Sequence, residues 1–200
     1  MRSRLRDVAV VVLAGAAVAA GAVEARRGRV RPAEARCFDA LNGVTDRAFA
    51  PTWVVMQLGS LGGALATGAT VIAAGHGGVG RRVATVGALA WLGSKIIKPF
   101  ARRGRPTAVL VGPRVLGRDQ AGLGYPSGHA AVAAAMAASA SPHLRRRVKA
   151  PLWLTAAGIG ATRVYIGAHL PLDVAGGLAL GVAVERCARV LLGPSVTDRA

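Results

Sequence analysis

The stretch Ala48–Gly80, "AFAPTWVVMQLGSLGGALATGATVIAAGHGGVG", contains no charged side chain along its whole length. A helix that crosses a bilayer needs roughly 20 mostly apolar residues, so this stretch is long enough to span the hydrocarbon core. A surface helix of a soluble protein shows a polar face, whereas the part from Pro51 to Ala74 shows none. We therefore interpret this stretch as a transmembrane segment.

Shorter charge-free windows recur along the rest of the chain, and arginine clusters separate them. Of the whole chain, 52% is hydrophobic and 18% is charged, less than the roughly 25% charged residues of a typical soluble domain. These features predict an all-α, polytopic membrane helical bundle with about six transmembrane helices, rather than a soluble alanine-rich bundle. The predicted spans are residues 7–24, 48–75, 83–98, 127–141, 150–166 and 171–192.

The first segment, Met1–Ala25, has a basic start, an apolar stretch and small residues near its end. A secretory signal peptide has the same features, but we favour a retained first helix because further hydrophobic segments follow. In the polar connection after it, Phe38, Leu41 and Val44 indicate a short amphipathic helix. The predicted organisation is an N-terminal helix with its connection (1–47), a core helical bundle (48–192) and a short C-terminal tail (193–200).

The net charge of +17 is compatible with nucleic-acid binding, but the arginines mostly mark the ends of apolar segments. Basic residues in such positions interact with anionic lipid headgroups. No basic stripe is interleaved with stacking aromatics, so we expect contact with membrane lipids and no nucleic-acid partner. The two cysteines, Cys37 and Cys187, have no metal or redox spacing and are interpreted as structural.

Three polar clusters stand out from the apolar background: "KPFARRGRP" (98–106), "YPSGH" (125–129) and "TRVYIGAHLPLD" (162–173). Each cluster lies at the end of a predicted span. If the spans alternate in direction, these ends fall on the same side of the membrane. The pattern therefore predicts that the three clusters meet in one site.

The clusters contain the groups that bind phosphate. Lys98, Arg105 and Arg163 are cations, and an arginine fork binds phosphate oxygens through two hydrogen bonds. Ser127 and Gly128 open a predicted helix, and the free N–H groups of a first helical turn bind anions. These five residues predict a phosphate-binding site.

Two histidines belong to the same clusters. Asp173 follows His169 by four residues, in the first turn of a helix that Pro171 is expected to start. A carboxylate bound to one imidazole nitrogen fixes the tautomer and leaves the other nitrogen free to attack. A second histidine, His129, can protonate a leaving oxygen as a general acid.

Other polar residues have simpler interpretations. His76 and His143 lie in predicted turns, where we expect structural roles. Glu185 has arginine neighbours that explain its presence in the last span. Four further arginines are expected to be solvated loop or surface charges: Arg102, Arg103, Arg114 and Arg118.

Together, Lys98 with Arg105-Pro106, the run Pro126-Ser127-Gly128-His129, and Arg163 with His169 and Asp173 resemble the three-part signature of the type 2 phosphatidic acid phosphatase superfamily, also called lipid phosphate phosphatases. Vanadium haloperoxidases and bacterial soluble acid phosphatases share this signature. The resemblance covers roughly residues 48–192, with the clusters in the expected order. One departure is Thr162, where the family usually has serine.

The resemblance implies that His169 is the nucleophile, that the reaction passes through a phosphohistidine, that Asp173 orients His169 and that His129 is the acid. It also implies that no metal or cofactor is required. Membrane members have a six-helix core in the cell membrane with the site on the extracytoplasmic face. The positive-inside rule alone does not fix this orientation, because the arginines of residues 26–36 would lie outside. The implied phosphate-binding residues are Lys98, Arg105, Ser127, Gly128 and Arg163.

The function expected from this resemblance is hydrolysis of a lipid phosphate or diphosphate by an integral membrane enzyme. A polyprenyl phosphate or diphosphate of envelope synthesis is the favoured substrate, ahead of phosphatidate and phosphatidylglycerol phosphate. One alternative is a vanadate-dependent haloperoxidase, against which the hydrophobic spans argue. Another is a non-catalytic membrane protein that binds lipid phosphates.

Overall fold

The computed structural model describes residues 2–118 and 120–193, and across these ranges the regular elements are helices, without a strand. The predicted all-α fold is therefore confirmed. Part of the predicted C-terminal tail, residues 194–200, lies outside the described residues. The helices are α1 (Arg2–Arg26), α2 (Pro32–Asn42), α3 (Phe49–Met56), α4 (Leu61–Ala73), α5 (Gly77–Ala101), α6 (Pro106–Val109), α7 (Gly128–Ala140), α8 (Arg146–Tyr165) and α9 (Pro171–Leu192).

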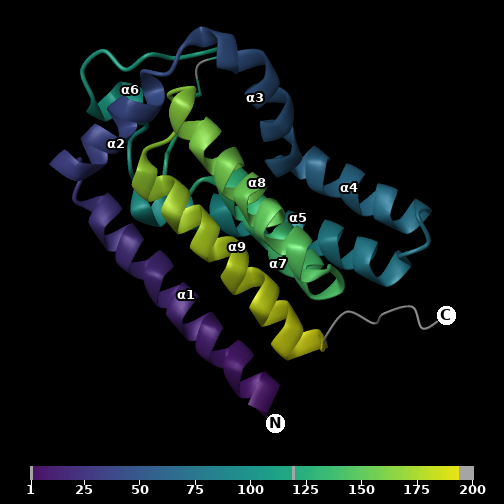
Figure 1. Cartoon of the computed structure of the whole chain (residues 1–200). Coiled ribbons are helices and arrows are strands. Elements are labelled where there is room, and N and C mark those ends of the chain that lie inside the picture. The colour runs from purple at the N-terminus through teal and green to yellow at the C-terminus, as the bar shows by residue number, and fades with distance from the viewer. Residues whose placement is uncertain (1, 119, 194–200) are drawn as a thin grey trace.

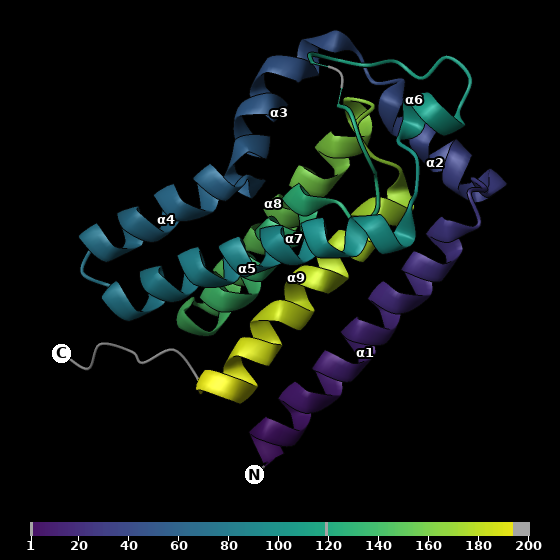
Figure 2. The ribbon, with the colours of Figure 1, turned by 180° about the vertical axis from the view of Figure 1, so that it is seen from behind.

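Helix α7 forms the centre of the bundle, and α5, α8 and α9 pack around it (Figures 1 and 2). Its alanine run is buried on every side, as Ala131 and Ala135 illustrate with no exposed surface. Because alanine side chains are short, the neighbouring helix backbones can approach α7 closely. The alanine-rich sequence after residue 129 therefore forms the core of the fold.

The glycine pair on α9 makes the closest of these approaches. A Cβ atom at Gly177 would overlap the carbonyl oxygen of Ser127, and one at Gly181 would overlap that of Ala131. The absence of side chains at these two positions therefore lets α9 pack directly on the α7 backbone. Gly59 likewise approaches the backbone of His129, whereas Gly63 lies against carbonyl groups of the connection before α4.

The predicted span 48–75 is not one straight helix. Helices α3 and α4 meet at an angle of 71° across a short break (Figure 1). The break ends at Ser60, whose Oγ accepts a hydrogen bond of 2.9 Å from the Gly63 N–H and caps α4. A serine N-cap is a helix-start signal, and the Ser60 cap interrupts the helix although the apolar pattern is continuous.

Among the described helices, only α1, from Arg4 to Arg26, is long and apolar enough by itself to cross a membrane, and the bent pair α3–α4 qualifies when taken together. By length and composition alone, the other predicted spans do not qualify as membrane-spanning helices. Helix α7 has 13 residues, about 20 Å at 1.5 Å per residue, whereas a hydrocarbon core is about 30 Å thick. Helices α5, α8 and α9 carry charged residues.

Helix α1 lies along α9 over most of its length (Figures 1 and 2). The Tyr125 hydroxyl donates a hydrogen bond of 2.7 Å to the Val18 carbonyl, and Arg186 pairs with Asp7 at 3.0 Å. The amphipathic helix expected in the connection is confirmed as α2, which buries Phe38 against the core. The N-terminal segment thus packs on the core, and the division at residue 48 stays a prediction.

Candidate active site

The three polar clusters lie at one end of the bundle. This end holds the C-terminal ends of α5 and α8 and the N-terminal ends of α7 and α9, close to α2 and α6 (Figure 1). A backbone hydrogen bond of 2.8 Å from the Ser127 N–H to the Asp173 carbonyl joins the second cluster to the third. The convergence expected from alternating helices is therefore present in the structure.

The centre of the site is the pair His169 and Asp173. Nδ1 of His169 lies 3.3 Å from Oδ2 of Asp173, and this oxygen also accepts a hydrogen bond of 2.9 Å from the Leu170 N–H. Pro171 starts α9, which places Asp173 in the first helical turn, as predicted. Burial lowers the pKa of His169 to about 3, against the opposing effect of Asp173, so the imidazole is neutral at neutral pH.

Two of the predicted cations hold the loops that surround this pair. The Lys98 ammonium donates hydrogen bonds of 2.8 and 2.7 Å to the carbonyls of Leu123 and Gly124. The Arg105 guanidinium donates to the carbonyls of Ala121, at 3.1 Å, and Ala168, at 2.7 Å. Both residues therefore bring a positive charge to the site while fixing its backbone.

Arg163 is the third cation and is almost completely buried. Its Nη1 contacts the Met56 sulfur at 3.3 Å, and its Nε has no hydrogen-bond partner among the described residues. Arg163 interacts electrostatically with Lys98, His129 and His169. A buried guanidinium with an unused N–H is suited to bind an anion.

The first turn of α7 lies between α5 and α9, beside the residues described above. Ser127 is its N-cap residue, but its buried hydroxyl makes no hydrogen bond to any described residue. A Cβ atom at Gly128 would lie 3.0 Å from the Ser94 hydroxyl, so glycine here also allows α5 to approach. The next residue, His129, interacts electrostatically with Arg163, His169 and Arg105. The structure thus brings all eight predicted site residues together.

One residue of the site was interpreted wrongly from the sequence. Arg103, expected to be a solvated loop charge, is buried and lies 3.3 Å from Oδ1 of Asp173. Its guanidinium also makes two hydrogen bonds, of 3.0 and 2.7 Å, to the carboxylate of Glu34 on α2. The backbone of Arg102 is left-handed at the end of α5, with φ of 50°, so Arg102 stays exposed while Arg103 turns inward.

Arg114 is also more than a surface charge. Its guanidinium hydrogen bonds to the Asp46 carboxylate and to two carbonyls at the end of α2, and it lies over the Tyr165 ring at 5.7 Å from the centroid. Arg118 is exposed, as expected. Glu185 pairs with Arg186, as expected, and with Arg82 of α5.

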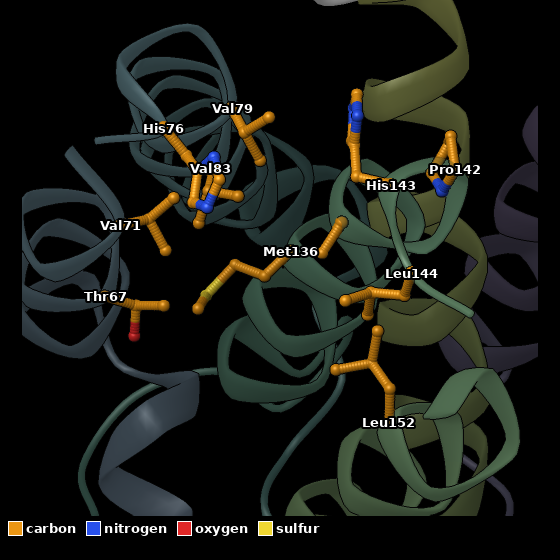
Figure 3. Close-up of a pocket in the computed structure, with 11 residues that line it drawn as sticks. Thr67, Val71, His76, Val79, Val83, Met136, Pro142, His143, Leu144 and Leu152 are labelled. Carbon is orange, nitrogen blue, oxygen red and sulfur yellow. The ribbon is translucent and has the colours of Figure 1, made fainter. Parts of the chain in front are cut away.

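The histidines interpreted as structural lie outside this site. His76 and His143 line an apolar cavity of about 570 Å³ at the opposite end of the bundle, between α4, α5 and α7 (Figure 3). Cys37 and Cys187 are free and exposed, so the structural role expected for them is not supported by burial. Among the described residues, no group of three or more histidines, cysteines and acidic residues could hold a metal ion.

The fold and the site define a helical bundle with three cationic side chains and two histidines gathered at one end. The family model described as PAP2 superfamily matches residues 80–193, more than half of the chain, and the chain belongs to this family. The resemblance expected from the three motifs is therefore confirmed. No curated protein matches the chain.

Among solved structures, the chain is similar to the crystal structure of the first transmembrane PAP2 type phosphatidylglycerolphosphate phosphatase from Bacillus subtilis. The two chains share 20% sequence identity, the match covers 100% of each chain, and the TM-score is 0.67. This similarity shows the fold and agrees with the predicted polytopic bundle. The family match begins at residue 80, so α1 to α4, including Glu34, lie outside it.

Proposed function

We propose that this protein is an integral membrane phosphatase that hydrolyses a lipid phosphate or diphosphate. The observation that carries the proposal is the cluster itself: three cations and a buried serine hydroxyl lie around two histidines, one of which is held by a carboxylate. Phosphoryl transfer mainly requires such positioning and charge stabilisation.

In the proposed reaction, Nε2 of His169 attacks the phosphorus while Nδ1 donates to Asp173. The bond between the phosphorus and the leaving oxygen breaks, and His129 gives that oxygen its proton. The product is a phosphohistidine. Water then attacks the phosphorus, His129 accepts a proton from it, and the bond to His169 breaks to release phosphate.

The surface of α5 supports a lipid substrate. Ile96 and Phe100, two residues before and after Lys98, are 56% and 67% exposed. The helix therefore turns an apolar face outward at the level of the site, which suits a position beside the hydrocarbon region. We favour a polyprenyl phosphate or diphosphate, and phosphatidate and phosphatidylglycerol phosphate are the other candidates.

The proposal is tested by measuring phosphate release from a panel of these lipids by purified protein in detergent. We expect release by the wild type and none by His169→Ala, because the nucleophile is missing. His143→Ala is the matched control, since His143 lies at the opposite end of the bundle, and it should retain full activity. No release from any lipid by the wild type would refute the function, and equal release by His169→Ala would refute the nucleophile.

The proposed chemistry uses the charges of Lys98, Arg105 and Arg163 where other phosphatases use metal ions. We therefore expect phosphate release to be unchanged after dialysis against EDTA. A loss of activity that added divalent metal restores would contradict this part of the proposal.

A further inference from the structure

We propose that Glu34, on the amphipathic helix α2, is a positioning residue of the active site. Through Arg103 it fixes the Asp173 carboxylate, and with it the orientation of His169. The effect on turnover rests on the proposed function, whereas the effect on His169 itself does not. The proposal also makes α2, which lies outside the residues matched by the family model, a part of the catalytic unit.

Glu34 makes a two-point contact with Arg103. Its Oε1 and Oε2 accept hydrogen bonds of 3.0 and 2.7 Å from Nη1 and Nη2 of the guanidinium. Such paired contacts fix the plane of the arginine as well as its position. Oε1 also accepts a hydrogen bond of 2.9 Å from the Leu172 N–H, in the first turn of α9. Glu34 therefore holds both Arg103 and the helix start that carries Asp173.

Arg103 in turn fixes one oxygen of Asp173. Nη1 has two hydrogens, and it lies within reach of both Glu34 Oε1 and Asp173 Oδ1. With Oδ1 held by Arg103, the other oxygen, Oδ2, faces His169 Nδ1 and the Leu170 N–H. The chain of contacts from Glu34 to His169 is thus continuous, and each carboxylate oxygen in it has a defined partner.

Burial makes this chain electrostatically important. The side chains of Arg103 and Asp173 are 1% and 0% exposed, and that of Glu34 is 11% exposed. Charges interact more strongly when water is excluded. The negative charge of Glu34 offsets that of Arg103, so Asp173 keeps its full effect on His169. Without Glu34, the uncompensated guanidinium would disfavour the positive charge that His169 develops.

The decisive variant is Glu34→Gln, which keeps the size of the side chain and removes its charge. We expect kcat to fall by about 10- to 100-fold, by analogy with the loss of partners that orient metal-bound histidines. KM should stay within about twofold because Glu34 is outside the phosphate-binding residues. The acidic limb of the kcat/KM profile should move to lower pH, because His169 becomes harder to protonate.

Two further variants separate positioning from simple stability. Glu24→Gln is the matched control, because Glu24 also pairs with two arginines in the N-terminal segment, at 2.9 and 2.7 Å, but outside the site. It should leave kcat and the pH profile unchanged. Glu34→Asp keeps the charge but is too short for every contact, so its kcat should lie between the wild type and Glu34→Gln, with the acidic limb near its wild-type position.

A readout independent of turnover is the imidazole N–H signal of His169 in ¹⁵N-histidine-labelled protein. The chain has four histidines, so single substitutions suffice to assign the signals. We expect the His169 Nδ1–H signal to shift in Glu34→Gln and to remain unchanged in Glu24→Gln. This measurement decides the inference even if no lipid is hydrolysed, a result that would refute only the proposed function.

The inference is overturned if folded Glu34→Gln has wild-type kcat, or if its yield falls while kcat per folded molecule, the acidic limb and the His169 signal stay unchanged. If Glu34→Gln does not fold, the same measurements on Glu34→Asp test the inference. Wild-type kcat and an unshifted His169 signal in that variant would equally overturn the inference.

Discussion

Ser127 combines two features that rarely occur together. It occupies the N-cap position of α7, where a serine hydroxyl usually accepts a hydrogen bond from the helix, yet its hydroxyl makes none to any residue that the structure describes. The side chain is nevertheless completely buried beside His129. An unused donor in this position is available for a phosphate oxygen and contributes little to the stability of the free protein.

We therefore predict that Ser127→Ala lowers activity without lowering stability. Loss of a hydrogen bond to a charged oxygen costs about 1.5–3 kcal/mol, so kcat/KM should fall about 10- to 100-fold. The melting temperature in detergent should not fall, because no hydrogen bond of the free protein is lost. Ser60→Ala is the control: it removes a cap that is formed, so it should cost about 1 kcal/mol of stability and leave activity per folded molecule unchanged. A destabilised Ser127→Ala would show that the hydroxyl caps the helix.

Arg163 supports a prediction about inhibitors. Vanadate adopts the geometry of the phosphoryl transition state and should inhibit well below the KM of the lipid. Arg163→Lys should weaken this inhibition by about tenfold or more, because a lysine cannot make the paired contacts of a guanidinium. Arg189→Lys, on α9 away from the site, is the control. Equal vanadate sensitivity in both variants would exclude Arg163 from the phosphate-binding group.

At the scale of single residues, type and spacing were enough to predict the eight residues that converge in the site. Residue type and spacing did not predict that Arg103 and Glu34 lie at the site. The inward turn of Arg103 depends on the left-handed backbone of Arg102, a position usually given to glycine, and no local pattern indicates it. Glu34 lies next to the site only because α2 packs against α9, and this contact joins segments far apart in sequence.

At the scale of helices, the contact between α7 and α9 holds the two halves of the site together. Gly177 lies where a Cβ atom would overlap the Ser127 carbonyl, and the Ser127 N–H donates to the Asp173 carbonyl. The distance between the first turn of α7 and the pair His169–Asp173 therefore depends on this close approach. A side chain at residue 177 would separate them.

We predict that Gly177→Ala lowers stability by about 1–3 kcal/mol, the usual cost of overpacking, and lowers kcat as well. Gly158→Ala on α8 is the matched control, because a Cβ atom there has no neighbour within 4 Å. It should be neutral or stabilise the protein by up to about 1 kcal/mol through better helix propensity. Thermal unfolding and phosphate release of the two variants test the prediction, and equal behaviour would contradict it.

The apolar pattern predicted where most helices run but not how they bend. A continuous charge-free stretch looks the same whether it is one helix or two, and the 71° angle between α3 and α4 depends on the Ser60 cap. Similarly, α5 extends to Ala101 and includes Pro99, three residues beyond the predicted end of the span at residue 98. Lys98, in the last turns of α5, donates hydrogen bonds to the carbonyls of Leu123 and Gly124, which connect this end of the helix to the loop before α7.

At the scale of the whole molecule, basic residues lie at both ends of the bundle, which left the orientation open. The structure shows that ion pairs offset part of the charge at the site end, where Arg27 and Arg31 pair with Glu24. At the other end, Arg186 and Arg189 pair with Asp7, and Arg82 pairs with Glu185, whereas the run Arg145–Arg147 is exposed. Since acidic residues contribute little to the positive-inside rule, these ion pairs do not fix the orientation, and a site on the extracytoplasmic face stays a prediction.

The two exposed cysteines can test this orientation without any added label site. Cys37 lies on α2 at the site end, and Cys187 lies in the last turns of α9 near the other end (Figure 1). In cells that express Cys187→Ser, a membrane-impermeant maleimide should label Cys37 without permeabilisation. In cells that express Cys37→Ser, Cys187 should react only after permeabilisation, which also controls for its accessibility. The reverse pattern would place the site on the cytoplasmic face, where it would act on lipid phosphates of the inner leaflet.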